Sequence, residues 1–199
     1  MLFFSTWYSG SGESPMSVPF EAIFKRVGAK YDVPWWLMAG MAHEASGFNP
    51  TIVGPTDDHG LMQVISSNAA GCGLTPEDLN DPEKNVTCAA QLLAKLFKRV
   101  NPLVSDAHHR RLFVMLANNM GWGNVGQKLK DGPRGWDDFK AKYPQMKRKY
   151  LWVERMDRRA ESYRPFGLDT DGTPTLPYVA GSGVESDTES GAGEKASGE

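Results

Sequence analysis

Hydrophobic residues recur along most of this chain at the spacing of one helix face, which predicts a protein built mainly from helices. The segment 33–45 is apolar on nearly every side, so we expect a buried helix there. Its start is expected at Asp32 and Pro34, a cap residue followed by an early proline, and its end at Gly47. Amphipathic or buried helices are also expected over about 18–31, 82–100 and 106–118, with two or three more between 122 and 163, separated at Gly132-Pro133.

The segment 46–65 departs from this pattern, because it is rich in Gly, Pro and Asp. Such composition predicts a loop, here with a short β-ribbon. A short helix is expected over 66–70 and a capped turn at 75–78. The predicted fold class is therefore all-α with a small ribbon and loop lobe.

The length of 199 residues suits one domain with a sizeable core. We expect that domain over 17–166, after a loose leader at 1–16. The segment 167–199 holds seven acids and one base, a net charge of −6, and its Gly, Ser and Thr content predicts disorder. No apolar stretch reaches the length of a membrane span.

Charge is also uneven within the expected domain. Residues 110–166 contain fourteen Lys or Arg and six Asp or Glu. A basic face suits an anionic polymer, and an ordinary solvated helix surface explains the same excess equally well. The aromatic and basic interleaving typical of nucleic-acid binding is absent from the sequence, so we expect no nucleic-acid partner.

Cys72 and Cys88 are the only cysteines. They could form a bridge in an oxidising compartment or remain buried thiols. The N-terminus lacks the basic start of a secretory signal. On that ground we favour free thiols.

Glu44 is the main candidate for chemistry. It follows the apolar run of 33–42 and falls in the last turn of the expected buried helix. Apolar surroundings and the negative end of the helix dipole both disfavour the charged form of a carboxyl, which suits a proton donor. The plainer alternative is a solvated glutamate at a helix end.

Five segments resemble, in order, the motifs of the soluble lytic transglycosylase (SLT) family. The first reads His-Glu-Ala-Ser-Gly-Phe-Asn-Pro at 43–50, close to the family's Glu-Ser-Gly-Phe-Asn-Pro. The second is Gly-Leu-Met-Gln-Val at 60–64, and the third is an Asp-Pro-x-x-Asn-Val helix start at 81–86. The fourth, Asn-Asn-Met-Gly-Trp-Gly-Asn-Val at 118–125, and the fifth, Trp-Val-Glu-Arg-Met at 152–156, complete a resemblance over about 20–163.

The sequence departs from the family pattern at four places. Ala45 is inserted after Glu44, and Asn118 stands where the fourth motif has a tyrosine. Trp152 stands where the family's fifth motif opens with a tyrosine, unless Tyr150 takes the role of that tyrosine after a register shift. Ser66 replaces a proline that often follows the second motif. A lost hydroxyl would affect the rate more than the type of reaction.

The resemblance implies a lysozyme-like fold and cleavage of the bond between N-acetylmuramic acid and N-acetylglucosamine in peptidoglycan strands. Glu44 would act as acid and then base, leaving a 1,6-anhydro end without use of water. We expect no cofactor and no metal, since Gly47 prevents a His-Glu-x-x-His zinc motif at His43. The residues expected to contact substrate are Ser46, Asp58, Gly60, Met62, Gln63 and Asn119.

Each of these residues has a structural alternative. Gln63 could bond a sugar N-acetyl group or its own loop, and Gly60 could let ligand approach the backbone. Met62 could line the site or pack in the core. Asn119 could face the site or cap a helix before Gly121.

Two further functions stay open. The segment 58–63, Asp-His-Gly-Leu-Met-Gln, also resembles the Asp-Tyr-Gly-Ile-Leu-Gln segment of animal-type lysozymes. Asp58 would then be the second carboxylate of a hydrolysing muramidase, although a turn residue is its plain alternative. The third function is a non-catalytic wall-binding or virion structural protein.

We expect the protein to act at the cell wall or periplasm. Without a recognisable signal peptide, we favour carriage in a phage virion over another route of export. Other virion or cell-envelope proteins would then be further partners.

Overall fold

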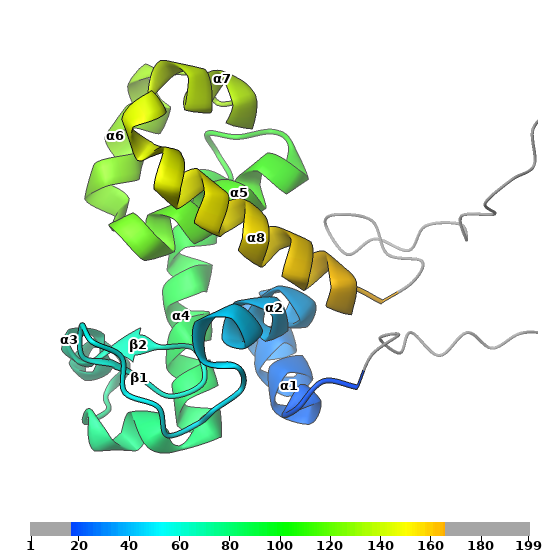
Figure 1. The fold of residues 1–199 in the computed structure, drawn as a ribbon, viewed down its shortest axis with the longest axis vertical. Coiled ribbons are helices and arrows are strands. Elements are labelled where there is room, and N and C mark those ends of the chain that lie inside the picture. The colour runs from blue at the N-terminus through cyan, green and yellow to red at the C-terminus, as the bar shows by residue number, and fades with distance from the viewer. Residues whose placement is uncertain (1–16, 166–199) are drawn as a thin grey trace, which may run out of the picture.

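The computed structural model describes residues 17–165, and helices dominate that part of the chain (Figure 1). The predicted leader at 1–16 and acidic tail at 167–199 lie outside the described residues. The helices are α1 (Glu21–Tyr31), α2 (Trp35–Ser46), α3 (Ser66–Ala69), α4 (Pro82–Val100), α5 (Ala107–Met120), α6 (Trp122–Asp131), α7 (Trp136–Lys142) and α8 (Lys147–Tyr163). Short 3-10 turns cover Ala70–Cys72, Glu77–Asn80 and Pro144–Met146.

The predicted β-ribbon is present within the 46–65 segment. Strands β1 (Asp58–His59) and β2 (Val64–Ile65) pair antiparallel, with Asp58 opposite Ile65 and His59 opposite Val64. The all-α fold class with a small ribbon lobe is therefore confirmed, as is the break between α6 and α7 at Gly132.

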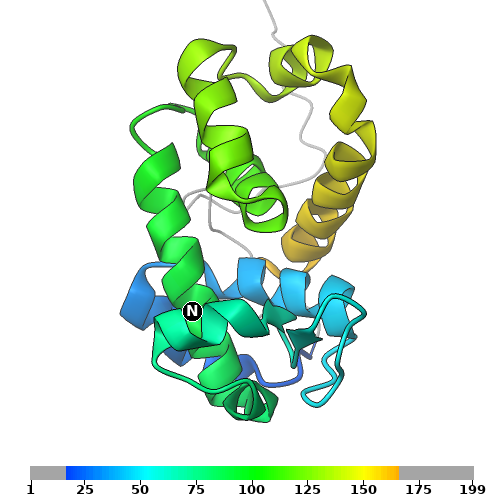
Figure 2. The ribbon, with the colours of Figure 1, turned by 90° about the vertical axis from the view of Figure 1, so that its left-hand side faces the viewer.

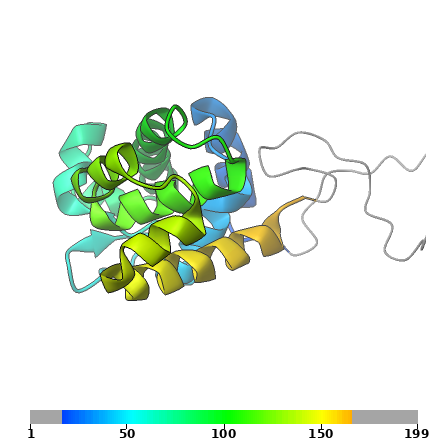
Figure 3. The ribbon, with the colours of Figure 1, turned by 90° about the horizontal axis from the view of Figure 1, so that it is seen from above.

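Helix α4 runs between the two ends of the molecule, with the ribbon at one end and α6 and α7 at the other (Figure 1). In the side view of Figure 2, α4 and α8 lie on opposite sides, with α5 and α6 between them. Seen from above, α8 forms one side of the helical body (Figure 3). The C-terminal end of α8 lies beside α2 (Figure 1). Residues there can therefore meet residues of α2 that lie more than 100 positions earlier in the chain.

Helix α2 begins and ends through two different devices. It ends at Gly47, as predicted, with a left-handed φ of 60° that favours glycine. The predicted start was wrong in one respect, because Asp32 closes α1 instead of capping α2. Only three residues separate the two helices, so Asp32 adopts the left-handed turn that ends α1 and Pro34 precedes the first turn of α2.

Helix α2 is the centre of the core. Its residues Trp36 to Ala42 are all buried. It packs directly on α8 at Gly40, where a Cβ would lie 2.4 Å from the Cα of Ala160. Glycine is thus required for the two helices to approach this closely, and the contact sets the middle of α2 against the C-terminal part of α8.

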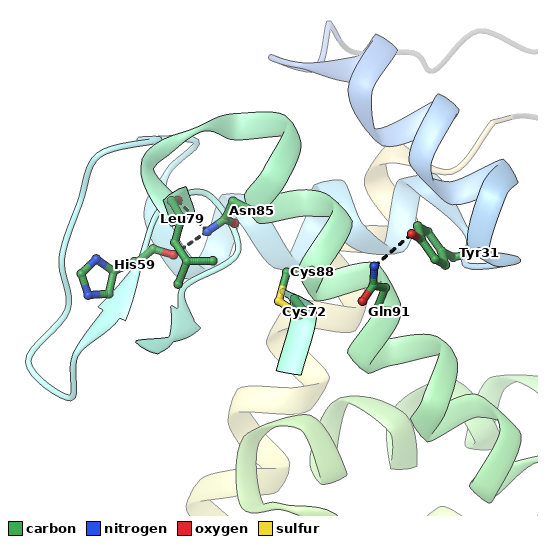
Figure 4. Close-up of a disulfide and its surroundings, with 7 residues drawn as sticks. All are labelled: Tyr31, His59, Cys72, Leu79, Asn85, Cys88 and Gln91. Carbon is green, nitrogen blue, oxygen red and sulfur yellow. Dashed lines mark hydrogen bonds between the residues drawn. A yellow bond between two sulfur atoms is a disulfide. The ribbon is translucent and has the colours of Figure 1, made fainter. Parts of the chain in front are cut away.

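Cys72 and Cys88 form a disulfide, with their Cα atoms 5.5 Å apart (Figure 4). The expectation of free thiols was therefore wrong. It rested on an argument about cellular compartment, whereas the fold places the turn at Ala70–Cys72 against α4. The bridge ties the ribbon lobe to the long helix that carries the third motif.

Candidate active site

Glu44 lies in the last turn of α2 and faces α8. Its side chain is 13% exposed. Its Oε2 accepts a hydrogen bond of 2.8 Å from Nε of Arg155, and its Oε1 accepts one of 3.2 Å from Nε of Arg159. The apolar surroundings expected from the sequence are therefore wrong, because two guanidinium groups stand beside the carboxyl. Both come from α8, which the pattern around residue 44 could not reveal.

An aromatic cluster lies next to Glu44. The ring centroids of His43 and Phe48 are 5.3 Å apart, and those of His43 and Tyr163 are 5.9 Å apart. His43 Nδ1 is hydrogen bonded to the hydroxyl of Tyr163. Burial lowers the pKa of His43, and the charge of Arg159 adds to this effect while Glu44 opposes it. Burial and the charge of Arg159 thus both favour the uncharged form of His43.

Ser46 joins the first motif to the second. Its hydroxyl lies 3.0 Å from the carbonyl oxygen of Ala42 and 2.8 Å from that of Leu61. The end of α2 is thereby fixed to the loop that holds Gly60 to Gln63. The structure places Ser46 on backbone groups, a contact that positions the loop.

Asn85 supports the same loop from α4, a role that the sequence reasoning missed. The side chain is fully buried and accepts a hydrogen bond of 2.8 Å from the backbone N–H of Met62. Its Nδ2 donates to the carbonyl oxygens of His59 and Leu79 at 2.7 and 2.9 Å (Figure 4). The signal was present as the asparagine of the Asp-Pro-x-x-Asn motif, four residues after the capping Asp81.

Gly60 and Met62 are set by this packing. A Cβ at Gly60 would lie 2.2 Å from the carbonyl oxygen of Leu79, and the residue has a left-handed φ of 70°. Glycine is therefore needed for the loop to rest on the structure beneath it, a reason different from ligand approach. Met62 is 8% exposed and belongs to the core cluster, which agrees with the packing alternative.

Gln63 and Asp58 both lie in the ribbon lobe. The Nε2 of Gln63 donates to the carbonyl oxygens of Ile52 and Gly60 at 3.1 and 3.0 Å, so this amide nitrogen bonds its own loop. Asp58 accepts a hydrogen bond from Oγ1 of Thr56. Among the described residues, no hydrogen bond or ion pair joins Asp58 to Glu44. Contact of Gln63 or Asp58 with a sugar stays a prediction.

The fourth and fifth motifs are placed differently. Asn119 is exposed in the last turn of α5, and the helix is capped by Gly121, whose N–H bonds the carbonyl of Ala117 at 2.8 Å. Tyr150 is buried and donates to the carbonyl of Tyr143 at 2.8 Å, and burial raises its pKa to about 12. Tyr150 therefore does not supply a motif hydroxyl near Glu44, whereas the hydroxyl of Tyr163 reaches the adjacent His43.

One cavity in the described part of the chain lies away from this site. It measures about 540 Å³ and lies at the other end of α2, where Trp35 and Trp36 line it together with residues of α1, α4 and α5. None of the candidate site residues lines it. The convergence of the motifs and the ion pairs makes the surroundings of Glu44 the candidate site.

Residues 17–165 lack two kinds of feature. No three or more His, Cys, Asp or Glu side chains there are grouped as a metal site would require. None of the helices in that range combines the length and the hydrophobicity that crossing a membrane demands.

The helical body, the small ribbon lobe and a glutamate at the end of a buried helix define a lysozyme-like domain. Its fold resembles that of the 70 kDa soluble lytic transglycosylase from Escherichia coli, with a TM-score of 0.62 and 22% identity over 73% of this chain and 24% of that one. Residues 22–136 match the family described as "Transglycosylase SLT domain", and the chain belongs to that family.

Named relatives agree with this membership. The chain is 32% identical over 141 residues to the membrane-bound lytic murein transglycosylase F of Serratia proteamaculans, covering 68% of this chain and 28% of the relative. It is 29% identical over 138 residues to the protein of that name from Vibrio cholerae, covering 66% and 25%. The chain thus spans about a quarter of the length of these relatives.

A second solved structure has the same fold. It is an inactive Glu-to-Gln variant of the lytic transglycosylase Slt from Pseudomonas aeruginosa, with a TM-score of 0.62, 20% identity and coverage of 73% of this chain and 24% of that chain.

Proposed function

We propose that this chain is a peptidoglycan lytic transglycosylase in which Glu44 is the general acid and then the general base. Membership of the SLT family and two relatives that carry the name lytic murein transglycosylase support this proposal. The inactive Pseudomonas variant is a Glu-to-Gln replacement, which fits a reaction that depends on one glutamate.

The proposed reaction needs a single carboxyl group. Protonated Glu44 donates its proton to the oxygen between N-acetylmuramic acid and N-acetylglucosamine. The bond between that oxygen and C1 of the muramic acid then breaks. The N-acetyl group of the muramic acid stabilises the positive charge at C1. Ionised Glu44 then takes the proton of the C6 hydroxyl, whose oxygen bonds to C1 and forms a 1,6-anhydro ring. Glu44 is protonated again, and no water is consumed.

The position of the Glu44 carboxyl is the observation that carries the proposal. It is the carboxyl of the first motif, it is largely shielded from solvent, and two hydrogen bonds from α8 hold both oxygens. Catalytic groups need such restraint, because proton transfer depends on the position of the donor. The guanidinium groups of Arg155 and Arg159 suit the stage at which Glu44 is a carboxylate.

The remaining site residues divide into two proposed roles. We assign substrate contact to Asp58, Gln63 and Asn119, which retain solvent exposure. Ser46, Gly60 and Met62 are assigned to holding the loop beside Glu44, because their contacts are with the protein.

We also propose residues 17–166 as the catalytic domain. Peptidoglycan strands are its proposed substrate at the cell wall. Carriage in a virion, and contacts with virion or envelope proteins, stay predictions from the sequence.

Mass spectrometry of muropeptides released from purified sacculi, without borohydride treatment, tests the reaction. Wild-type protein should release products with anhydro-muramic ends, each lighter by one water than a hydrolysed end. The variant Glu44→Gln should release none. Reducing ends that disappear with Asp58→Asn would instead identify a muramidase. Absence of any release by folded wild-type protein would favour the binding or structural alternative.

A further inference from the structure

Two arginines of α8 have Glu44 as their only anionic partner among the described residues. Arg155 and Arg159 are four positions apart, so they lie on the same helix face. Each bonds Glu44 through Nε, and neither guanidinium bonds another acceptor within residues 17–165. An arginine has five N–H donors, so the Nη groups of both side chains are available to a ligand.

The charge at this place is unbalanced. Two cations face one carboxylate, and the other acids of α8 do not correct the excess. Glu154, Asp157 and Glu161 are each bonded to basic side chains other than Arg155 and Arg159. The helix therefore presents an unneutralised positive charge directly beside the proposed catalytic carboxyl.

Stability does not explain the arginine pair. The side chains of Arg155 and Arg159 are 57% and 39% exposed, and ion pairs with such exposed partners contribute little to folding. The contact between α2 and α8 is already made by the close packing of Gly40 on Ala160. Holding Glu44 uses only the Nε donors of the two arginines, and a role in ligand binding accounts for the charge and the donors that remain.

We propose that Arg155 and Arg159 bind a carboxylate of the peptide carried by the substrate's muramic acid. This inference rests on the proposed function, because the sugar that is cleaved at Glu44 also bears the peptide. Guanidinium groups bind carboxylates through paired hydrogen bonds, which matches this ligand. In the free protein Glu44 occupies the Nε donor of each arginine, and its negative charge opposes the binding of a second carboxylate at the same guanidinium groups.

A selectivity measurement tests the inference. The ratio of kcat/KM for peptide-bearing glycan to kcat/KM for glycan stripped of peptide by an amidase should be about tenfold lower in Arg155→Gln and in Arg159→Gln, through loss of charge-assisted hydrogen bonds. The control Arg158→Gln removes an exposed arginine of the same helix that does not bond Glu44, and it should leave the ratio unchanged. An unchanged ratio in both test variants, with turnover retained, would overturn the inference and leave the proposed function standing.

A binding measurement separates the inference from catalysis. Calorimetry would compare a disaccharide tetrapeptide with the same molecule after amidation of its carboxylates. The variant Glu44→Gln should bind the acidic form several-fold more tightly than wild-type protein does, since the competing carboxylate is gone.

Adding Arg155→Gln and Arg159→Gln to that variant should abolish the preference for the acidic form. Equal binding of the two ligands by Glu44→Gln, in protein whose fold is verified by circular dichroism, would contradict the inference even if no variant turns over substrate.

Discussion

Two clusters of charged side chains connect α8 to earlier helices, and they differ in burial and in charge balance. At Asp157, the carboxylate accepts hydrogen bonds from Arg111 at 2.7 Å and His108 at 2.8 Å. The Arg111 side chain is 3% exposed and that of Asp157 is 10% exposed. At Glu44, the acid is shielded but both arginines are largely open to solvent.

The difference separates a structural cluster at Asp157 from the cluster at Glu44, which we propose to be functional. Burial alone would raise the pKa of Asp157, but the hydrogen bonds from His108 and Arg111 outweigh it and bring the pKa below its ordinary value. Both oxygens of the Asp157 carboxylate accept hydrogen bonds from within the protein. The cluster at Glu44 keeps positive charge and unused donors on the solvent side, which is what a ligand requires.

The largest effect on folding is expected at Arg111. Arg111→Met should lower the free energy of unfolding by about 3–5 kcal/mol, because it removes the buried guanidinium that pairs with Asp157 and leaves that carboxylate bonded to His108 alone. Urea unfolding followed by circular dichroism measures this loss. Arg158→Gln, an exposed arginine, should change little. A loss below about 1 kcal/mol for Arg111→Met would show that the buried cluster does not stabilise the fold.

Asn85 is a buried polar residue of α4 that supports the ribbon lobe. Asn85→Ala should lower the free energy of unfolding by about 2–3 kcal/mol, since it leaves the N–H of Met62 and two carbonyls without a partner. The turnover should also fall, because this loop is proposed to lie beside Glu44. Asn68→Ala, at an exposed position of α3, is the matched control. Equal stability of the two variants would remove the proposed support for the loop.

The exposed cluster should contribute far less to folding. The double variant Arg155→Gln with Arg159→Gln is expected to lose less than about 1 kcal/mol of unfolding free energy, because both side chains are solvated. Thermal and urea unfolding against wild type measure the difference. A loss as large as that of Arg111→Met would make the Glu44 cluster structural.

The smallest effect is expected from His108, and it should depend on pH. The hydrogen bond to Asp157 raises the pKa of His108 above its ordinary value of 6.5. The protonated form is thus favoured in the folded state. Its stabilisation is fully present below pH 6.5 and is lost as the pH rises through the raised pKa.

The difference in unfolding free energy between wild type and His108→Gln should therefore be larger well below pH 6.5 than well above it. It should stay below about 1 kcal/mol, since the side chain is 44% exposed. His109→Gln serves as the neighbouring control. A difference that grows as the pH rises would contradict the prediction that the folded state favours the protonated form of His108.

Hydrophobic spacing predicted most of the fold. The helix expected over 82–100 is α4 with the same bounds, and Gly47 ends α2 as expected. These features depend on neighbouring residues, so a local pattern reveals them. Asp32 was misassigned because the same residue type suits a cap and a left-handed turn, and the short connection between α1 and α2 decided between them.

The surroundings of Glu44 could not be predicted in the same way. Arg155 and Arg159 lie 111 and 115 positions later, and only the packing of α8 on α2 brings them to the carboxyl. The apolar run before Glu44 describes the inward side of α2, whereas its carboxyl faces α8. The disulfide also depends on the tertiary fold, because the chain leaving the ribbon packs against α4 and thereby brings Cys72 to Cys88.

The most direct test of the account measures turnover and unfolding for Glu44→Gln in one preparation. We expect release of anhydro-ended muropeptides to fall by about three orders of magnitude, the scale of a lost acid–base group. The free energy of unfolding should stay within about 1 kcal/mol of wild type, because the arginines that pair with Glu44 are exposed. Retained turnover together with a loss of several kcal/mol would instead show that Glu44 serves the fold and not the reaction.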